Sequence, residues 1–188
     1  MRKNKKQKNN LKRNLLLFGF LLIIVSLIDT KNDKKDFSLL ASNEKTIYTN
    51  VNAKEVINIL NEDTGVLLIV DDKRDINKIT NILDNLKTDE NIYVYNSSKD
   101  EMILDLKEGE LYKVQDSSDD YNILLKKLGN YTEEYLINGI DTGYRRINTP
   151  MVIFIKNGTI EYSYYISNIV GEETLTNIYS AGFARIEN

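Results

Sequence analysis

The chain of 188 residues contains a single proline, and its position limits the folds that the surrounding sequence can adopt. Pro150 follows Thr149 and opens the apolar run 151–155, after which Asn157-Gly158 separates this run from a second strand-like stretch. Asn-Gly between two apolar runs is typical of a tight β-hairpin, because both central residues of such a turn have positive φ. Proline is tolerated at the first residue of a strand, and its cis peptide bond costs little. We therefore predict a hairpin over 151–166 that follows a cis Thr149–Pro150 bond.

The amino-acid composition excludes several kinds of chemistry, because the chain has no cysteine, histidine or tryptophan. Cys-x-x-Cys redox sites, catalytic pairs of cysteine or serine with histidine, and Cys/His zinc sites are all impossible. Carboxylate, lysine, serine and tyrosine chemistry remains available, as do metal sites built from oxygen ligands. The sequence points to no cofactor, no catalytic residue and no metal ligand.

The charge of the chain is unevenly distributed along the sequence. Residues 1–13 contain seven Lys and Arg side chains and no acid, although the formal net charge of the whole chain is −3. The rest of the chain therefore carries a charge of −10. An acidic balance of this size argues against a nucleic-acid-binding surface, so we expect no nucleic-acid partner.

An apolar segment follows the basic run. Residues 15–28 carry no charge, and a basic run before such a core is typical of a signal peptide or a signal anchor. The core is short for a spanning helix, which favours a cleaved signal peptide. However, no small-x-small cleavage site follows Ile28 and no cysteine is present for lipidation, so we favour an uncleaved anchor. A cleaved signal peptide and a buried helix of a soluble domain remain open as alternatives.

These features divide the chain into four predicted segments. They are a basic cytoplasmic tail over 1–13, a transmembrane signal anchor over 14–29, a polar tether over 30–46 and a folded domain over 47–188. Because basic flanks stay in the cytoplasm, we expect a single-pass protein of the cell membrane with its folded domain outside.

Apolar periodicity predicts alternating helices and strands in the folded domain. Helices are expected after Asn52, which begins a capping box with Glu55, and after Asp75 as a second N-cap. Strands are expected at 66–70 and 92–95, and a βαβ unit of this kind predicts parallel pairing. The Pro150 hairpin follows, and a last helix is expected after Gly171.

The middle of the domain has a mixed pattern, which we interpret as an insertion before the Pro150 hairpin. In it, Met102 to Leu106 is a candidate helix, 121–128 is a better helix that ends at Gly129, and Asn138-Gly139 predicts a second hairpin. The resulting order, α-β-α-β-insert-β-β-α, predicts an α/β sandwich. In the strand after Asn157-Gly158, alternation places Tyr162, Tyr164, Ile160 and Ile166 on one face.

The residues from 124 to 160 resemble a known family. They contain a short helix, a glycine and an acidic hairpin, followed by Arg145-Arg146, Pro150 and the turn Lys156-Asn157-Gly158. This order resembles the membrane-anchored thioredoxin-like proteins of low-GC Gram-positive bacteria, often labelled bacteriocin-transport accessory proteins. The resemblance covers about residues 50–187, and the amino-terminal anchor is also similar. It implies a thioredoxin-like α/β sandwich with an insertion before the cis-proline hairpin, plus an amino-terminal transmembrane helix.

The chain departs from this family where the family has its Cys-x-x-Cys motif. The resemblance places Lys73, Arg74, Asp75 and Ile76 at the motif, so both reactive positions have lost their thiols. Dithiol–disulfide exchange needs a thiolate that attacks sulfur, and we therefore expect no thiol–disulfide oxidoreductase activity. The segment 73–76 could instead bind an anion or a partner, or it could be a solvated loop before a helix.

Thioredoxin-like folds bind extended chains beside their cis-proline, so the resemblance makes Thr149 and Pro150 a candidate binding face. We expect a redox-inactive, membrane-anchored, extracytoplasmic module that binds a protein or peptide partner. Two alternatives remain: a carboxylate- or lysine-dependent enzyme on the same scaffold, and an accessory factor for the export of, or immunity to, a bacteriocin.

Overall fold

The computed structural model describes residues 48–86, 90–166 and 170–187. The predicted basic tail, signal anchor and tether lie outside the described residues. Within the described part of the chain, no helix combines the length and the apolar character needed to cross a membrane.

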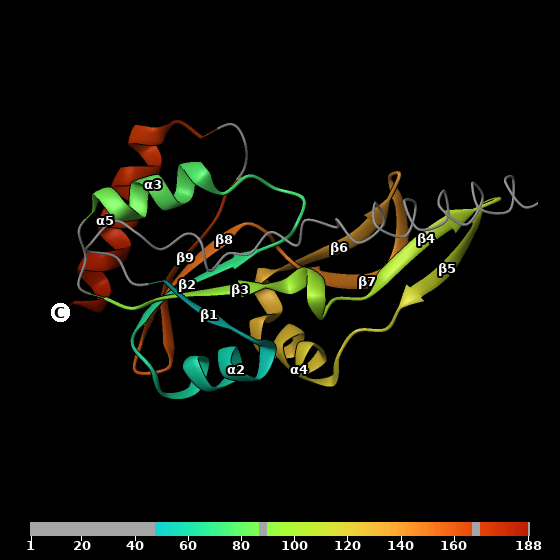
Figure 1. The fold of residues 1–188 in the computed structure, drawn as a ribbon, viewed down its shortest axis with the longest axis horizontal. Helices are drawn as coiled ribbons and strands as arrows, with labels where there is room; N and C mark the ends of the chain where they lie inside the picture. The colour runs from blue at the N-terminus through green and yellow to red at the C-terminus, as the bar shows by residue number, and fades with distance from the viewer. Residues whose placement is uncertain (1–47, 87–89, 167–169, 188) are drawn as a thin grey trace, which may run out of the picture. The chain divides into compact units, whose positions relative to one another are not determined.

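A five-stranded mixed sheet forms the centre of the described domain (Figure 1). Its spatial order is β1-β3-β2-β8-β9, in which β1, β3 and β2 are parallel, β8 is antiparallel to β2, and β9 is antiparallel to β8. The strands are β1 (Tyr48–Val51), β2 (Gly65–Val70), β3 (Ile92–Asn96), β8 (Met151–Lys156) and β9 (Thr159–Tyr165). The parallel βαβ unit and the Pro150 hairpin predicted from the sequence are thus confirmed.

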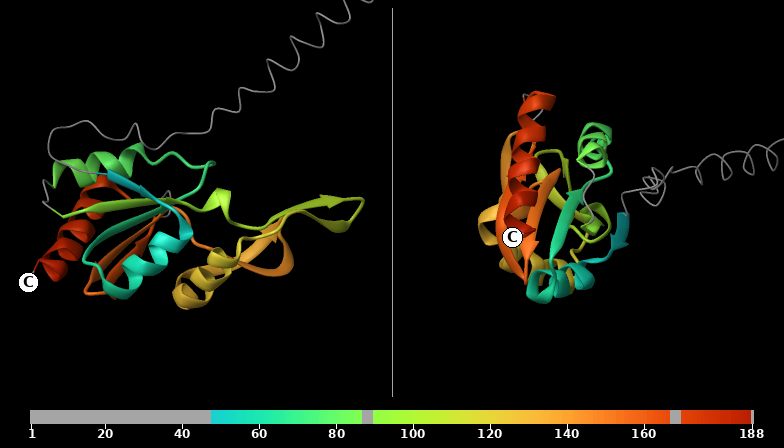
Figure 2. Two further views of the ribbon diagram at one scale, coloured as in Figure 1. Left: turned by 60° about the horizontal axis from the view of Figure 1, so that its bottom comes forward. Right: turned by 90° about the vertical axis from the view of Figure 1, so that its left-hand side faces the viewer.

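Helices cover both faces of this sheet, which confirms the predicted α/β class. The helices are α2 (Ala53–Glu62), α3 (Asn77–Asn85), α4 (Asp119–Leu128) and α5 (Glu172–Ile186). Helices α3 and α5 pack with Leu68 and Phe154 on one face, whereas α2 and α4 pack with Leu67 and Ile153 on the other. The two views of Figure 2 show these pairs of helices on opposite sides of the strands.

Two strands in the middle of the sheet hold the layers together. Every residue of β2 is buried, and so is every residue of β8 except Lys156. A strand that is covered on both faces reads as a continuous apolar run, because neighbouring side chains point to opposite faces. The runs 65–70 and 151–155 therefore supply side chains to both halves of the core.

Two hairpins are inserted between β3 and β8. They are β4 (Ile103–Lys107) with β5 (Glu110–Gln115), and β6 (Thr132–Ile137) with β7 (Ile140–Ile147). The hairpins contact each other through β4 and β6, and Figure 1 shows both beyond the end of the central sheet. The second hairpin turns at Asn138-Gly139, as the sequence predicts.

The expected helix from Met102 to Leu106 is wrong, because these residues lead into and form β4. Glu108 and Gly109 have φ of 52° and 85°, which makes a tight two-residue turn back into β5. Leu104 and Leu106 alternate with polar residues and so follow the period of a strand rather than that of a helix. Leu104 is buried, and its N–H donates to the hydroxyl of Tyr135 on β6.

The predicted face pattern of β9 is wrong for Ile160, because β9 contains a β-bulge. The register of β8 and β9 shifts between Phe154 and Ile155, so that Phe154 pairs with Tyr162 and Ile155 pairs with Ile160. As a result, Ile160 packs against the α2 and α4 side, whereas Tyr162, Tyr164 and Ile166 pack against the α3 and α5 side.

Candidate functional site

The loop after β2 is organised by a buried carboxylate. Asp71 is 8% exposed, and its Oδ1 accepts hydrogen bonds from the backbone N–H groups of Lys73 at 2.8 Å and Arg74 at 2.9 Å. An aspartate that binds N–H groups two and three residues further on fixes a local turn. Asp71 therefore holds the backbone that carries the side chains of 73–75.

The same carboxylate joins this loop to Pro150. The hydroxyl of Thr149 donates to Asp71 Oδ2 at 2.5 Å, and the Thr149–Pro150 peptide bond is cis, as predicted. The N–H of Ile166 donates to the carbonyl of Pro150 at 3.1 Å, which fixes the position of the end of β9. Three segments far apart in the sequence thus meet at the carboxyl end of β2.

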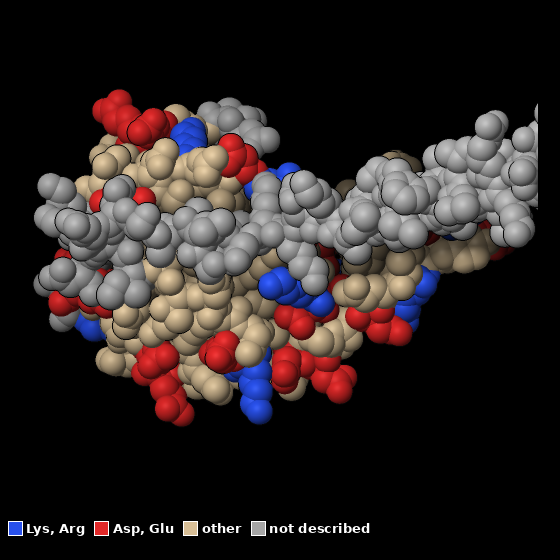
Figure 3. Space-filling model, viewed as in Figure 1, with Lys and Arg blue, Asp and Glu red and all other residues tan. Residues whose placement is uncertain are grey.

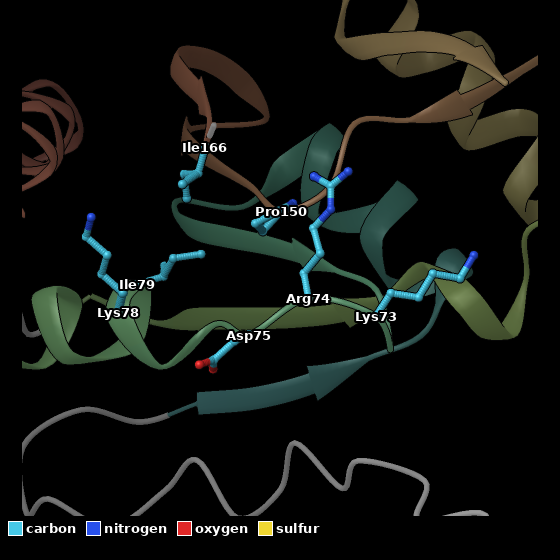
Figure 4. A pocket seen from close by; sticks show the side chains of 7 residues that line it. All are labelled: Lys73, Arg74, Asp75, Lys78, Ile79, Pro150 and Ile166. Atoms are coloured by element: carbon cyan, nitrogen blue, oxygen red, sulfur yellow. The ribbon is translucent and has the colours of Figure 1, made fainter. Parts of the chain in front are cut away.

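A cavity of about 360 Å³ lies where these segments meet. Figure 4 shows Ile79, Pro150 and Ile166 pointing toward one another, with Arg74 and Lys78 on either side of them. The side chains of Lys73 and Asp75 extend away from this apolar group, although both residues contribute to the lining. A volume of about 360 Å³ is at the lower end of the range of small-ligand pockets.

The charged side chains of the cavity are held by neighbours. Arg74 donates a hydrogen bond to the hydroxyl of Tyr165 at 3.0 Å, and its guanidinium carbon lies 5.8 Å from the centroid of the Tyr165 ring. Its Nε also lies 3.8 Å from Asp71 Oδ2. Lys78 Nζ donates to the carbonyl of Val170 at 2.6 Å. These contacts limit the conformations of both cations beside the apolar group.

The structure brings most of the predicted site residues together. Lys73, Arg74, Asp75 and Pro150 all line the cavity. Thr149 is 7% exposed and supports the site through Asp71, so it does not offer a side chain to a ligand.

Two details of the predicted site are corrected. Ile76 is 4% exposed and belongs to the core cluster on the α3 and α5 side of the sheet. Asp75 is not the N-cap of α3. Ile76 occupies that position without a side-chain cap, and Asp75 Oδ1 instead accepts from the N–H of Asn77 at 3.0 Å, one residue beyond the cap.

Sequence reasoning missed Lys78, Ile79 and Ile166. Ile79 and Ile166 follow the apolar pattern of the core, and Lys78 looks like a solvent-exposed residue of an amphipathic helix. Lys78 and Ile79 lie in the first turn of α3, shortly after the loop 73–75, and this closeness in the sequence is the local signal that could have found them.

A second group of polar residues lies at the end of β3. Burial raises the pKa of the Glu101 carboxyl, and the positive charges of Lys73 and Arg146 oppose this shift. The hydroxyl of Tyr95 donates to Asp100 at 3.1 Å, and burial is the main cause that raises the pKa of Tyr95. Among the described residues, no group of three or more His, Cys, Asp and Glu side chains could hold a metal ion.

The inserted hairpins carry most of the large hydrophobic side chains that are exposed in the described residues. Seven of the nine large hydrophobic side chains that are exposed in the described residues belong to them. These seven are Ile103, Leu111, Tyr112, Val114, Leu136, Ile140 and Tyr144. By contrast, Arg145 and Arg146, which contributed to the family resemblance, stabilise the hairpin itself. Arg145 Nε donates to Thr132 Oγ1 at 2.8 Å, and Arg146 forms an ion pair with Glu133 at 2.7 Å.

The chain matches no model of a protein family, and it has no significant match among curated proteins or among solved structures.

Proposed function

We propose that this protein is a thioredoxin-like module without redox chemistry that binds an extended segment of a peptide or protein partner beside Pro150. The strand order β1-β3-β2-β8-β9 supports this assignment, as do three parallel strands followed by an antiparallel hairpin and helices on both faces. The cis peptide bond before Pro150 at the start of β8 is a further point of agreement.

One observation carries the functional part of the proposal. The loop residues 73–75 and Pro150, which are far apart in the sequence, line one cavity. Asp71 connects the two segments, because its carboxylate accepts hydrogen bonds from the N–H of Lys73 and from the hydroxyl of Thr149. A site that is fixed before its ligand arrives loses less conformational entropy on binding. A scaffold whose reactive thiols are absent therefore keeps a preformed surface for recognition.

The proposal also includes a location for the protein, which rests on the amino-terminal sequence. The basic run 1–13 and the apolar core 15–28 support a single membrane-spanning anchor, with the folded domain outside the cell. The bacteriocin-transport accessory proteins that the sequence resembles have such an arrangement. A role as an accessory factor for an exported peptide would be one instance of the binding function, and a peptide exporter encoded by a neighbouring gene would favour it.

Site-specific photo-crosslinking in intact cells tests the proposal. A photoreactive amino acid placed at Lys73 or Lys78, at the cavity, is expected to capture a partner. The same group at Lys126, which is exposed on α4 across the sheet, is the matched control and is expected not to. Equal capture from all three positions would contradict binding at the cavity.

A second candidate function is a carboxylate-dependent enzyme, and the raised pKa of Glu101 favours it. A carboxyl whose pKa is moved toward neutrality is suited to general acid–base work. Turnover by the purified protein that is lost in Glu101→Gln, with the fold intact by circular dichroism, would establish this function in place of binding alone.

A further inference from the structure

The cavity has a charge that differs from the rest of the domain. The chain beyond residue 13 carries a formal charge of −10, and Figure 3 shows Asp and Glu side chains spread over the visible face of the domain. The cavity, in contrast, is lined by three cations and one carboxylate. The cations are Lys73, Arg74 and Lys78, and the carboxylate is Asp75. A locally positive hollow on an acidic protein selects for negatively charged groups.

The positions of these charges make the selection more specific. Asp75 extends away from the apolar group of Ile79, Pro150 and Ile166, whereas Arg74 and Lys78 stand on either side of it (Figure 4). Asp71 offsets part of the charge of Arg74 at 3.8 Å but is itself nearly inaccessible. A ligand therefore meets a small apolar surface with a cation at each end.

Lys78 is able to donate to a ligand while it keeps its hydrogen bond to the carbonyl of Val170. An ammonium group has three N–H donors, and the contact with the Val170 carbonyl at 2.6 Å uses one of them. Arg74 is held by the hydroxyl and the ring of Tyr165, so its planar guanidinium is already oriented at the cavity wall.

We infer that the ligand of this cavity is an acidic peptide, in which carboxylate side chains lie two residues before and two residues after an apolar side chain, and so on the same face of an extended segment. This inference rests on the proposed peptide-binding function and adds the chemical class of the peptide. The apolar side chain covers Ile79, Pro150 and Ile166, and the carboxylates on the same face of the segment contact Arg74 and Lys78. The apolar group favours a peptide over a small inorganic anion, which would leave that surface in contact with water.

Selection from a random peptide library on the full-length chain, purified in mild detergent, tests this inference. We expect the enriched sequences to contain Asp or Glu two residues away from an apolar residue. Enriched sequences without an excess of acids would overturn the inference and leave the peptide-binding function in place. If no sequence is enriched, both the inference and the proposed function are contradicted. Inorganic phosphate that competes as well as an acidic peptide would show that the cavity binds simple anions instead.

Point variants then locate the charge contact. For a labelled acidic peptide from the selection, Lys78→Gln is expected to weaken binding by about two- to fivefold, the range for one exposed charge pair. Lys126→Gln removes the same charge from the opposite face and is expected to leave the affinity unchanged.

The same peptide with each acid replaced by its amide should bind wild type and Lys78→Gln equally. Affinity for the acidic peptide should fall when salt is raised from about 0.05 M to about 0.5 M, since salt screens exposed charges. A charge effect that is equal in Lys126→Gln, or an affinity that does not depend on salt, would overturn the inference.

Discussion

The central sheet and the inserted hairpins form from similar local sequence signals, but they differ in how deeply their strands are buried. Both contain antiparallel pairs with glycine in a tight turn, at Gly109, Gly139 and Gly158. In the sheet, β2 and β8 are covered on both faces. In the insertion, no residue of β5 is buried.

This difference in burial suggests different roles for the two regions in the stability of the domain. An isolated two-stranded hairpin is marginally stable in water, and a hairpin gains stability when it packs against other elements. The β8–β9 hairpin does so through Phe154, which packs against Tyr179 and Phe183 of α5. The inserted hairpins retain exposed apolar side chains instead. We therefore expect the sheet to determine the free energy of unfolding and the insertion to contribute surface.

The largest expected effect is at Phe154, which is completely buried. Phe154→Ala leaves a cavity between β8 and α5 and should lower the free energy of unfolding by about 3–5 kcal/mol. Tyr112→Ala in β5, where the side chain is 46% exposed, should change it by less than about 0.5 kcal/mol. Chemical denaturation of the two variants measures the difference. Equal losses would break the proposed division between the two regions.

A glycine comparison isolates packing from turn geometry. Gly158 and Gly139 have φ of 73° and 80°, so alanine at either position adopts an unfavourable backbone at a cost of about 1–2 kcal/mol. At Gly158 a Cβ would also clash with the backbone carbonyl oxygen of Asn61, whereas at Gly139 it would meet nothing within 4 Å. Gly158→Ala should therefore cost about 1–3 kcal/mol more than Gly139→Ala. Similar thermal-denaturation midpoints for the two variants would show that the close approach to α2 is not restrictive.

The support of the cavity depends on Asp71. Asp71→Ala leaves the N–H groups of Lys73 and Arg74 and the hydroxyl of Thr149 without their acceptor, so we expect a loss of about 1–3 kcal/mol. Asp71→Asn keeps one acceptor oxygen and should lose less. Both variants should also weaken peptide binding, because the loop is then less fixed. Unchanged peptide affinity in Asp71→Ala, measured by fluorescence anisotropy, would show that binding does not need the preformed loop.

The smallest expected effect concerns pH. Burial raises the pKa of Glu101 above its ordinary value of 4.5, so the folded protein holds this proton more tightly than the unfolded chain does. The stabilising contribution of protonated Glu101 is present below pH 4.5 and is lost as the pH rises through the pKa of the folded state. Glu101→Gln should therefore gain stability relative to wild type as the pH rises above about 4.5. A difference in unfolding free energy that stays constant with pH would contradict the raised pKa.

Sequence patterns predict the sheet well, because its signals are strong and local. The continuous apolar run at 66–70, the capping box from Asn52 to Glu55 and the turn at Asn157-Gly158 each predict their element, and the structure has all three. The loop 73–75 and Pro150, which are both candidate binding segments in the sequence, line one cavity.

The remaining errors arise where tertiary contacts decide. Strand β1 has little apolar pattern and was not predicted; it pairs with β3, and the hydroxyl of its Tyr48 donates to Asp84 at 2.7 Å. The bulge that moves Ile160 to the other face depends on how β9 pairs with β8, which alternation alone does not encode. Lys78 joins the cavity only because α3 packs beside Pro150.

Amide chemical-shift mapping with a peptide selected on the protein compares the two regions directly. Our central claim is that recognition takes place at the end of the sheet, beside Pro150. It predicts that the largest shifts occur at Lys73, Arg74, Lys78 and Ile166, with small shifts in β4–β5 and β6–β7. Shifts concentrated at Tyr112, Val114 and Tyr144, with the cavity residues unchanged, would contradict it and would move the binding site to the inserted hairpins.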